Sequence, residues 1–256
     1  MGKDIGQAVR EIVFSLPETE EVLSHGSPSF RVRGRTFATF TVNHHGDGRV
    51  ALNVQAPPGA QQLCTERDPE HYFVPAYTGP RGWLGIDLNK GLSWKAIAAR
   101  VREAYEAAAP PELTRSLGDT IEIDPPDRPM RPEEIDLFLR PRATEVLARL
   151  ARICESLPET SRDRQFGNPV WKAGRRTFVG SQHRQGRLHL SFWVGADRQT
   201  FLEEDPRYCI PAYTGHNGWI DLDVEDRADW NEIEDLVMDS YRHFALKRML
   251  RSLGEA

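Results

Sequence analysis

Few cysteines, few lysines and no long apolar run set the first limits on this 256-residue chain. Cys64, Cys154 and Cys209 lie far apart, form no C-x-x-C pair and are odd in number, which excludes a disulfide framework. We expect reduced, mostly buried thiols. No stretch approaches the roughly 20 apolar residues that cross a bilayer, so no membrane partner is expected. The first residues lack the apolar core and cleavage site of a signal peptide, which predicts a cytoplasmic location.

The net charge of −5 comes from one short segment of the chain. Residues 1–118 carry 13 basic and 13 acidic side chains, and residues 140–256 carry 18 of each. Residues 119–139 carry 2 basic and 7 acidic ones. Neither half is therefore the strongly basic body of a strong nonspecific DNA binder, although a local basic face is compatible with this balance.

Internal repetition is the strongest signal in the sequence. The pentapeptide Ser15–Thr19 recurs as Ser156–Thr160, at an offset of 141, whereas Pro75–Gly79 recurs as Pro211–Gly215, at an offset of only 136. The five residues lost in between predict a shorter hairpin in the second copy, because loops tolerate such changes. The chain is thus expected to hold two copies of one domain.

An acidic, proline-rich segment separates the copies. We place the first copy at 1–112, the linker at 113–130 and the second copy at 131–256. Proline-rich composition favours a stiff, extended connection over a packed element. Ile121 and Ile123 leave open the alternative that the linker docks on a domain surface.

Each copy has the pattern of a small α+β domain. Apolar spacing predicts terminal helices at 4–16, capped by Asp4, and at 94–107, capped by Ser93. The second copy's first helix is predicted at 131–157, with a break near Pro141 left open. The fold class is two tandem repeats of an antiparallel sheet with the N- and C-terminal helices packed on one face. The other elements are predicted as strands at 20–25, 29–33, 36–42, 49–55, 71–74 and 82–88, the last half-buried, and a helix at 59–67.

The runs Ser29–Phe37 and Pro75–Leu88, followed by Trp94, resemble the MmcQ/YjbR family. The second copy carries the same skeleton, so the resemblance covers almost everything outside the linker and termini. It implies a CyaY-like α+β fold, described as a double wing, and it implies DNA binding. Members are often single domains. The fusion would therefore reproduce a pseudo-symmetric dimer within one chain, and the oligomeric state is left open, with a monomeric pseudo-dimer as one outcome.

Basic side chains surround the predicted hairpin turn at Gly34. Their period-two spacing places Arg31, Arg33 and Arg35 on one sheet face, where guanidinium groups suit phosphate contacts. A solvated strand face is the structural alternative. The second copy offers Lys172, Arg175 and Arg176.

The loops before the glycine-tryptophan strands form the second candidate group. An arginine or histidine beside tyrosine and tryptophan can stack on bases or on a flat ligand. A structural role, in which each tryptophan anchors its strand to the core, is the favoured alternative. The candidates are Tyr77, Arg81 and Trp83 in the first copy and Tyr213, His216 and Trp219 in the second.

No catalytic motif is visible, and no nucleophile and base recur together in both copies. His44-His45 has no third ligand at metal spacing, so neither metal nor cofactor is expected. The favoured hypothesis is a non-enzymatic protein that binds DNA through its basic hairpins. The alternative is a small aromatic ligand bound in a cleft between the copies, as in a drug-sequestering protein of a producing bacterium.

Overall fold

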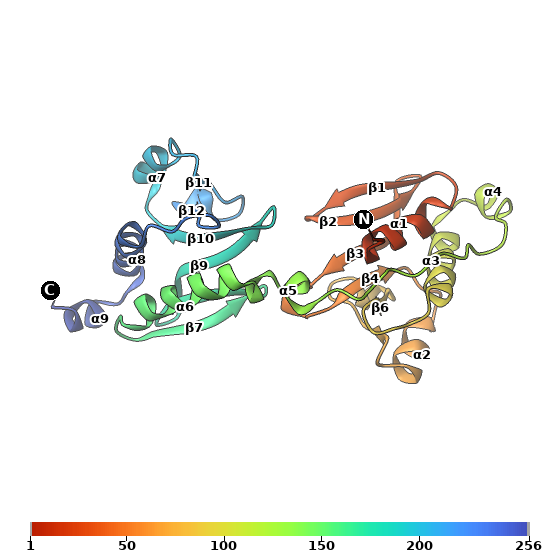
Figure 1. Cartoon of the computed structure of the whole chain (residues 1–256), viewed down its shortest axis with the longest axis horizontal. Coiled ribbons are helices and arrows are strands. Elements are labelled where there is room, and N and C mark those ends of the chain that lie inside the picture. The colour runs from red at the N-terminus through yellow and green to blue at the C-terminus, as the bar shows by residue number, and fades with distance from the viewer. Residues whose placement is uncertain (1, 255–256) are drawn as a thin grey trace. The chain divides into compact units, whose positions relative to one another are not determined.

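The computed structural model describes residues 2–254, and the chain divides into two compact units between Ile135 and Asp136 (Figure 1). Each unit has its own antiparallel sheet of six strands and its own cluster of buried apolar side chains. Two tandem α+β units confirm the predicted fold class. Within residues 2–254, no helix combines the length and apolar character needed to cross a membrane.

The first unit follows the predicted order of elements. Its strands are arranged β1-β2-β3-β4-β6-β5. The elements are α1 (Ile5–Phe14), β1 (Thr19–Ser24), β2 (Ser27–Val32), β3 (Arg35–Val42), η1 (His44–Gly46), β4 (Val50–Val54), α2 (Ala60–Arg67), β5 (Tyr72–Phe73), η2 (Gly79–Arg81), β6 (Leu84–Asp87), α3 (Trp94–Ala108), α4 (Pro111–Thr114) and α5 (Pro132–Ile135).

The second unit repeats this plan, with strands arranged β11-β12-β10-β9-β8-β7. A short η3 precedes α6, so the predicted 131–157 helix is broken, because the proline at 141 favours a new first turn. The elements are η3 (Leu137–Leu139), α6 (Pro141–Glu155), β7 (Thr160–Gln165), β8 (Asn168–Ala173), β9 (Arg176–Arg184), β10 (Arg187–Trp193), α7 (Ala196–Leu202), β11 (Tyr208–Cys209), η4 (Gly215–Asn217), β12 (Trp219–Asp223), α8 (Trp230–Phe244) and α9 (Lys247–Ser252).

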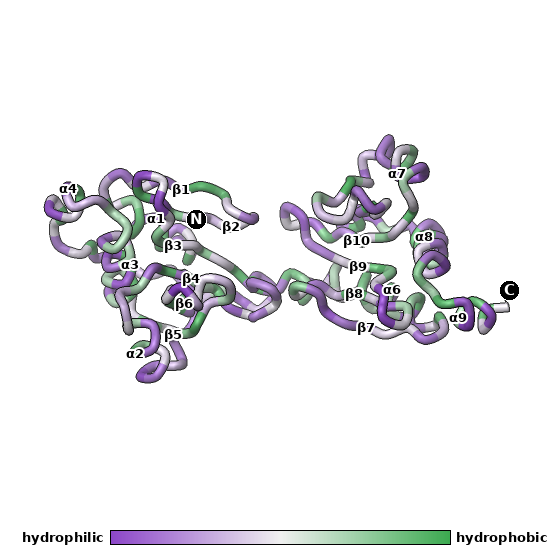
Figure 2. The backbone as a smooth tube through the Cα atoms, turned by 180° about the vertical axis from the view of Figure 1, so that it is seen from behind, coloured by the Kyte–Doolittle hydropathy of each residue, from purple (hydrophilic) through white to green (hydrophobic). Residues whose placement is uncertain are grey.

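Local side chains explain where the terminal helices begin. The Asp4 carboxylate accepts a hydrogen bond from the Gln7 backbone amide, and the Gln7 side-chain oxygen accepts one from the Asp4 backbone amide, which forms the capping box of α1. Ser93 caps α3 and Asp229 caps α8, because each accepts hydrogen bonds from otherwise unpaired first-turn amides. The predicted caps at Asp4 and Ser93 are confirmed. The edge strand β7 is hydrophilic throughout (Figure 2), which suits a strand with one unpaired side.

The five-residue difference between the copies falls in two places. In the first unit Ala38 pairs with Val54, whereas in the second unit the equivalent Val179 pairs with Phe192. The β9–β10 hairpin is therefore shorter than the β3–β4 hairpin by three residues, as predicted. The remaining two are missing from the connection between β10 and α7.

Strand β6 differs from the half-buried strand that its alternation predicts. All four of its residues are buried. Gly85 lies beneath the ring of Phe73, and a Cβ added to this glycine would come within 2.6 Å of the ring atoms. The face that alternation leaves to solvent is thus covered by an aromatic side chain, and only glycine leaves room for it.

The acidic linker packs on the first unit, which is the alternative that the isoleucines left open. It has no regular structure from residue 118 to 131, yet its apolar side chains lie against the first core. Asn89 exchanges two hydrogen bonds with the Met130 backbone, at 2.8 and 3.0 Å, and the Asp127 amide donates to the Lys3 carbonyl at 3.0 Å. The packed linker residues are Leu113, Leu117, Ile121, Ile123 and Met130, and Ile135 of α5 packs there as well.

This docking predicts that a fragment of residues 1–135 folds cooperatively and is more stable than one of residues 1–112. We expect at least about 2 kcal/mol of difference in the free energy of unfolding, because the shorter fragment exposes apolar surface that the linker covers. Urea unfolding followed by circular dichroism measures this. Equal midpoints for the two fragments would show that the linker contributes no stability.

Candidate functional site

The three hairpin arginines of the first unit do not share one sheet face, contrary to the sequence prediction. Arg33 lies in the two-residue turn with a φ of 49°, next to Gly34 with a φ of 74°, as type I′ turns require. Arg35 pairs with the buried Val32, whereas Arg31 is the neighbour of Val32 in its strand. Cross-strand partners share a face and neighbours alternate, so Arg31 and Arg35 point to opposite faces. The same pairing in the second unit separates Lys172 from Arg176.

Two of the six basic side chains are already neutralised. Arg33 donates to both carboxylate oxygens of Glu18, one at 3.0 Å, and Lys172 is paired with Asp163. Arg31 donates to the Thr36 hydroxyl at 3.2 Å and is half-buried. The remaining three are exposed, and no carboxylate among residues 2–254 lies within ion-pair distance of them. They are Arg35, Arg175 and Arg176.

The loop residues divide between exposed rings and half-buried ones. Tyr77 is 67% exposed and Tyr213 is 82% exposed. Arg81 and His216 are exposed as well, and His216 contacts the Asn217 amide at 2.9 Å. Trp83 and Trp219 are half-buried and belong to neither core cluster, so the core anchor of the second unit is the fully buried Trp171 instead.

Basic groups from separate segments meet at one end of the second unit, around Glu159. Arg248 of α9 donates to both oxygens of this carboxylate, one at 2.9 Å, and the Gly174 amide of the β8–β9 turn donates to its backbone carbonyl at 3.0 Å. Helix α9 is held in place by Met249, which is fully buried. We call this surface the basic end and define it as Arg175, Arg176, His243, Lys247, Arg248 and Arg251.

An aromatic stack adjoins the basic end. The rings of Trp193 and His243 are parallel at 3.4 Å, and Trp219 stacks on Phe244 at 5.6 Å. Partial burial, and then the charge of Arg176, lower the pKa of His243, which keeps its ring neutral near pH 7. The sequence reasoning missed Trp193, His243 and the α9 residues. The available signal was the stretch 242–251, which contains five basic or histidine residues and no acid.

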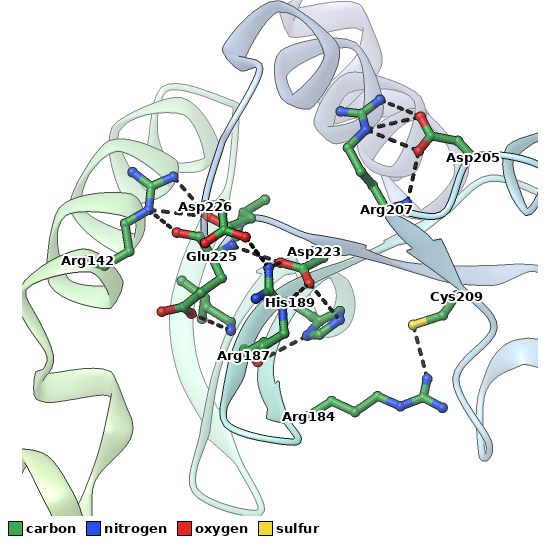
Figure 3. A network of polar contacts seen from close by, with 12 residues as sticks. Arg142, Arg184, Arg187, His189, Asp205, Arg207, Cys209, Asp223, Glu225 and Asp226 are labelled. Atoms are coloured by element: carbon green, nitrogen blue, oxygen red, sulfur yellow. Dashed lines mark hydrogen bonds and ion pairs between the residues drawn. The ribbon is translucent and has the colours of Figure 1, made fainter.

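A second polar network lies on the face of the second sheet that carries Asp223, along strands β10 and β12 (Figure 3). Arg187 donates to Asp223 at 2.5 Å and to Asp226 at 2.6 Å, and His189 lies 3.9 Å from Asp223. Arg184 contacts the Cys209 sulfur at 3.0 Å. Burial, and then the charge of Asp221, raise the pKa of this thiol, so the network does not generate a reactive thiolate at neutral pH.

Asp221 is the fully buried carboxyl of this face. It accepts hydrogen bonds of 2.5 Å from the Ser191 hydroxyl and from the Gln182 amide. Desolvation nevertheless raises its pKa, because these neutral donors do not replace the water that the carboxylate loses.

Among the described residues, no group of three or more histidine, cysteine or acidic side chains is arranged to hold a metal ion.

Asp221→Asn is predicted to stabilise the second unit at neutral pH by a few degrees in Tm. The folded pKa of Asp221 lies above the unfolded value of 3.8, so its stability contribution is present at acid pH and is lost as pH rises. Asparagine carries no charge at any of these pH values, so it does not lose stability as pH rises. Its amide can still be paired, because the Ser191 hydroxyl and the Gln182 side chain can each accept a hydrogen bond as well as donate one. Thermal unfolding from pH 4 to 8 should show a gain that grows with pH.

Asp223→Asn is the matched control and is predicted to have the opposite sign. Burial alone would raise the pKa of Asp223, but the hydrogen bonds from Arg187 and from the Glu225 amide lower it. Its stability contribution is therefore present above pH 3.8 and is lost as pH falls. The account of Asp221 is wrong if both variants destabilise the unit equally at pH 7 and pH 4.

Comparisons with known proteins match each unit separately. A family model described as YjbR matches twice, over residues 14–107 and 155–243. A crystal structure of the Deinococcus radiodurans protein DR2400, with the family-model domain DUF419, is similar at 19% identity and a TM-score of 0.37. That match covers 43% of this chain and 88% of the other. No curated protein matches.

Proposed function

This chain belongs to the YjbR family, whose domain it carries in two tandem copies, and from that premise we propose that it is a non-enzymatic protein that binds DNA through the basic end of its second unit. The convergence of α9 and the β8–β9 turn on Glu159 supports the proposal. Three guanidinium groups and one ammonium group, from Arg175, Arg176, Lys247 and Arg251, stand exposed there without an ion-pair partner among residues 2–254.

The aromatic stack adds a second mode of contact. His243 is exposed and lies flat on Trp193. An exposed ring of this kind offers a surface on which an unpaired base stacks, while neighbouring guanidinium groups bind the phosphates. The combination favours binding without strong sequence preference, because stacking and phosphate contacts read no base edges.

The first unit carries only part of this surface, since Arg35 and Arg115 match Arg176 and Arg251 but other positions differ. At an offset of 136, the position of Arg248 is occupied by Glu112, that of Lys247 by Pro111 and that of His243 by Ala107. The charge of Glu112 acts on the hairpin residue Arg33, whose pKa is raised first by Glu18. DNA contact is therefore assigned to the second unit rather than to two equivalent hairpins.

A salt titration with paired variants tests this assignment. Arg176→Ala is expected to weaken binding of a labelled oligonucleotide by roughly 3–10-fold and to reduce the slope of log K against log salt by about one, because one phosphate contact is lost. Fluorescence anisotropy from about 50 to 200 mM salt measures both quantities. Single- and double-stranded oligonucleotides of one sequence test the contribution of stacking.

Arg35→Ala is the matched control, because Arg35 is the first-unit counterpart of Arg176 and is equally exposed. It is expected to leave affinity and slope unchanged. Equal losses from the two variants would contradict the assignment to the second unit. No saturable binding at about 50 mM salt would contradict DNA binding altogether.

A small aromatic ligand is the second candidate, favoured by one cluster in the first unit. The rings of His44 and His45 lie 6.1 and 5.5 Å from the exposed ring of Tyr77. The three rings come from the longer β3–β4 hairpin and the loop before β6, and the shorter second hairpin has no counterpart. Quenching of intrinsic fluorescence by a panel of planar ligands, lost in Tyr77→Ala, would support this candidate.

A further inference from the structure

A groove lies between helices α6 and α8 of the second unit. Its volume is about 600 Å³. Apolar side chains of both helices form much of its lining, and charged residues lie beside them. The lining residues are Arg149, Arg152, Ile153, Ser156, Leu157, Glu234, Val237 and Met238.

The first unit has a depression at the equivalent positions, between α1 and α3. Its lining includes Ile12, Ser15 and Leu16, which match Ile153, Ser156 and Leu157 at an offset of 141. Ala98 and Arg102 match two α8 residues of the open groove at an offset of 136. The two hollows are therefore the same feature of the repeated fold.

The linker occupies the hollow of the first unit but leaves that of the second unit open. Residues 117–121 form one wall of the first depression, which has a volume of only about 240 Å³. Leu117 and Ile121 pack against the core, and Arg102 donates a hydrogen bond to the Gly118 carbonyl. An extended chain with two apolar side chains four residues apart therefore fits this groove of the fold.

Charge differs between the two grooves. The positions of Arg149 and Arg152 correspond to Ala8 and Glu11 in the first unit. Arg149 is held by stacking over the Trp230 ring, with its guanidinium carbon 4.4 Å from the ring centroid. The second groove gains two arginines, but it also gains Glu234 at the position of Ala98 and has Met238 at the position of Arg102. These four positions thus change by one net positive charge, which favours an acidic occupant.

We propose that the α6–α8 groove binds an extended, acidic segment of a partner protein. The segment carries two apolar side chains four residues apart, which enter the groove, and carboxylates that meet Arg149 and Arg152. The linker itself defines this chemistry, since residues 117–124 read LGDTIEID. In the first unit, Arg102 binds a backbone carbonyl of the linker. Met238 stands at the equivalent position of the second unit, so the charges of Arg149 and Arg152 take over the polar recognition there.

A labelled synthetic peptide of residues 116–126, added to the full chain, tests the proposal by fluorescence anisotropy. We expect saturable binding that Arg152→Glu weakens at least about tenfold, a loss of about 1.4 kcal/mol. A peptide with serine at the positions of Leu117 and Ile121 should bind at least as weakly. Arg152 is exposed, so its replacement leaves the fold intact, which a thermal unfolding curve verifies.

Arg227→Glu is the matched control, because it makes the same charge change at another exposed position. It should leave peptide binding unchanged. The absence of saturable binding up to about 1 mM peptide, or equal effects of the two charge reversals, would overturn the proposal. A concentration-dependent dimer that Arg152→Glu abolishes would assign the groove to a second copy of this chain and would also overturn it.

Discussion

The contact of helix α3 or α8 with the turn after the first helix of its unit governs how each unit is assembled. The hydroxyl of Tyr105 donates to the Pro17 carbonyl at 2.9 Å, and that of Tyr241 donates to the Pro158 carbonyl at 2.7 Å. Each tyrosine ring also packs edge-on against a buried phenylalanine of the adjacent strand. The repeated Ser-Leu-Pro-Glu-Thr turn is thus tied to α3 or α8. Both helices are thereby fixed on one sheet face, and the groove between them is a consequence.

The two units also differ on the opposite sheet face. The registers make Gly85 equivalent to Asp221 and Phe73 equivalent to Cys209. In the first unit a large ring covers a glycine, and in the second a small thiol lies beside a carboxyl. The exchange replaces an apolar cover with a polar network. Asp221 accepts hydrogen bonds from Ser191 and Gln182, whose first-unit equivalents are Asn53 and Thr41.

The sequence predicted the features that depend on local pattern. Caps such as Asp4, the strand alternation and the repeat follow from residues that are close together or duplicated. The face of Arg31 and Arg35 was mispredicted, because the two-residue turn pairs Arg35 with Val32 and thereby places it on the face opposite Arg31. The α9 part of the basic end was missed, and the docked linker was only an alternative, because both depend on contacts between segments far apart in the chain. No periodicity in the sequence encodes such contacts.

Duplication explains why both proposed surfaces lie in the second unit. In the first unit, the linker covers the helix groove and Glu112 replaces an arginine beside the hairpin. Covering the groove shields apolar surface and thereby stabilises that unit, at the cost of an accessible site. The second unit gains its basic end from α9, which Met249 anchors to the core while the groove stays uncovered. In the first unit, the segment that follows α3 therefore covers the helix groove. In the second unit, the segment that follows α8 forms part of the basic end.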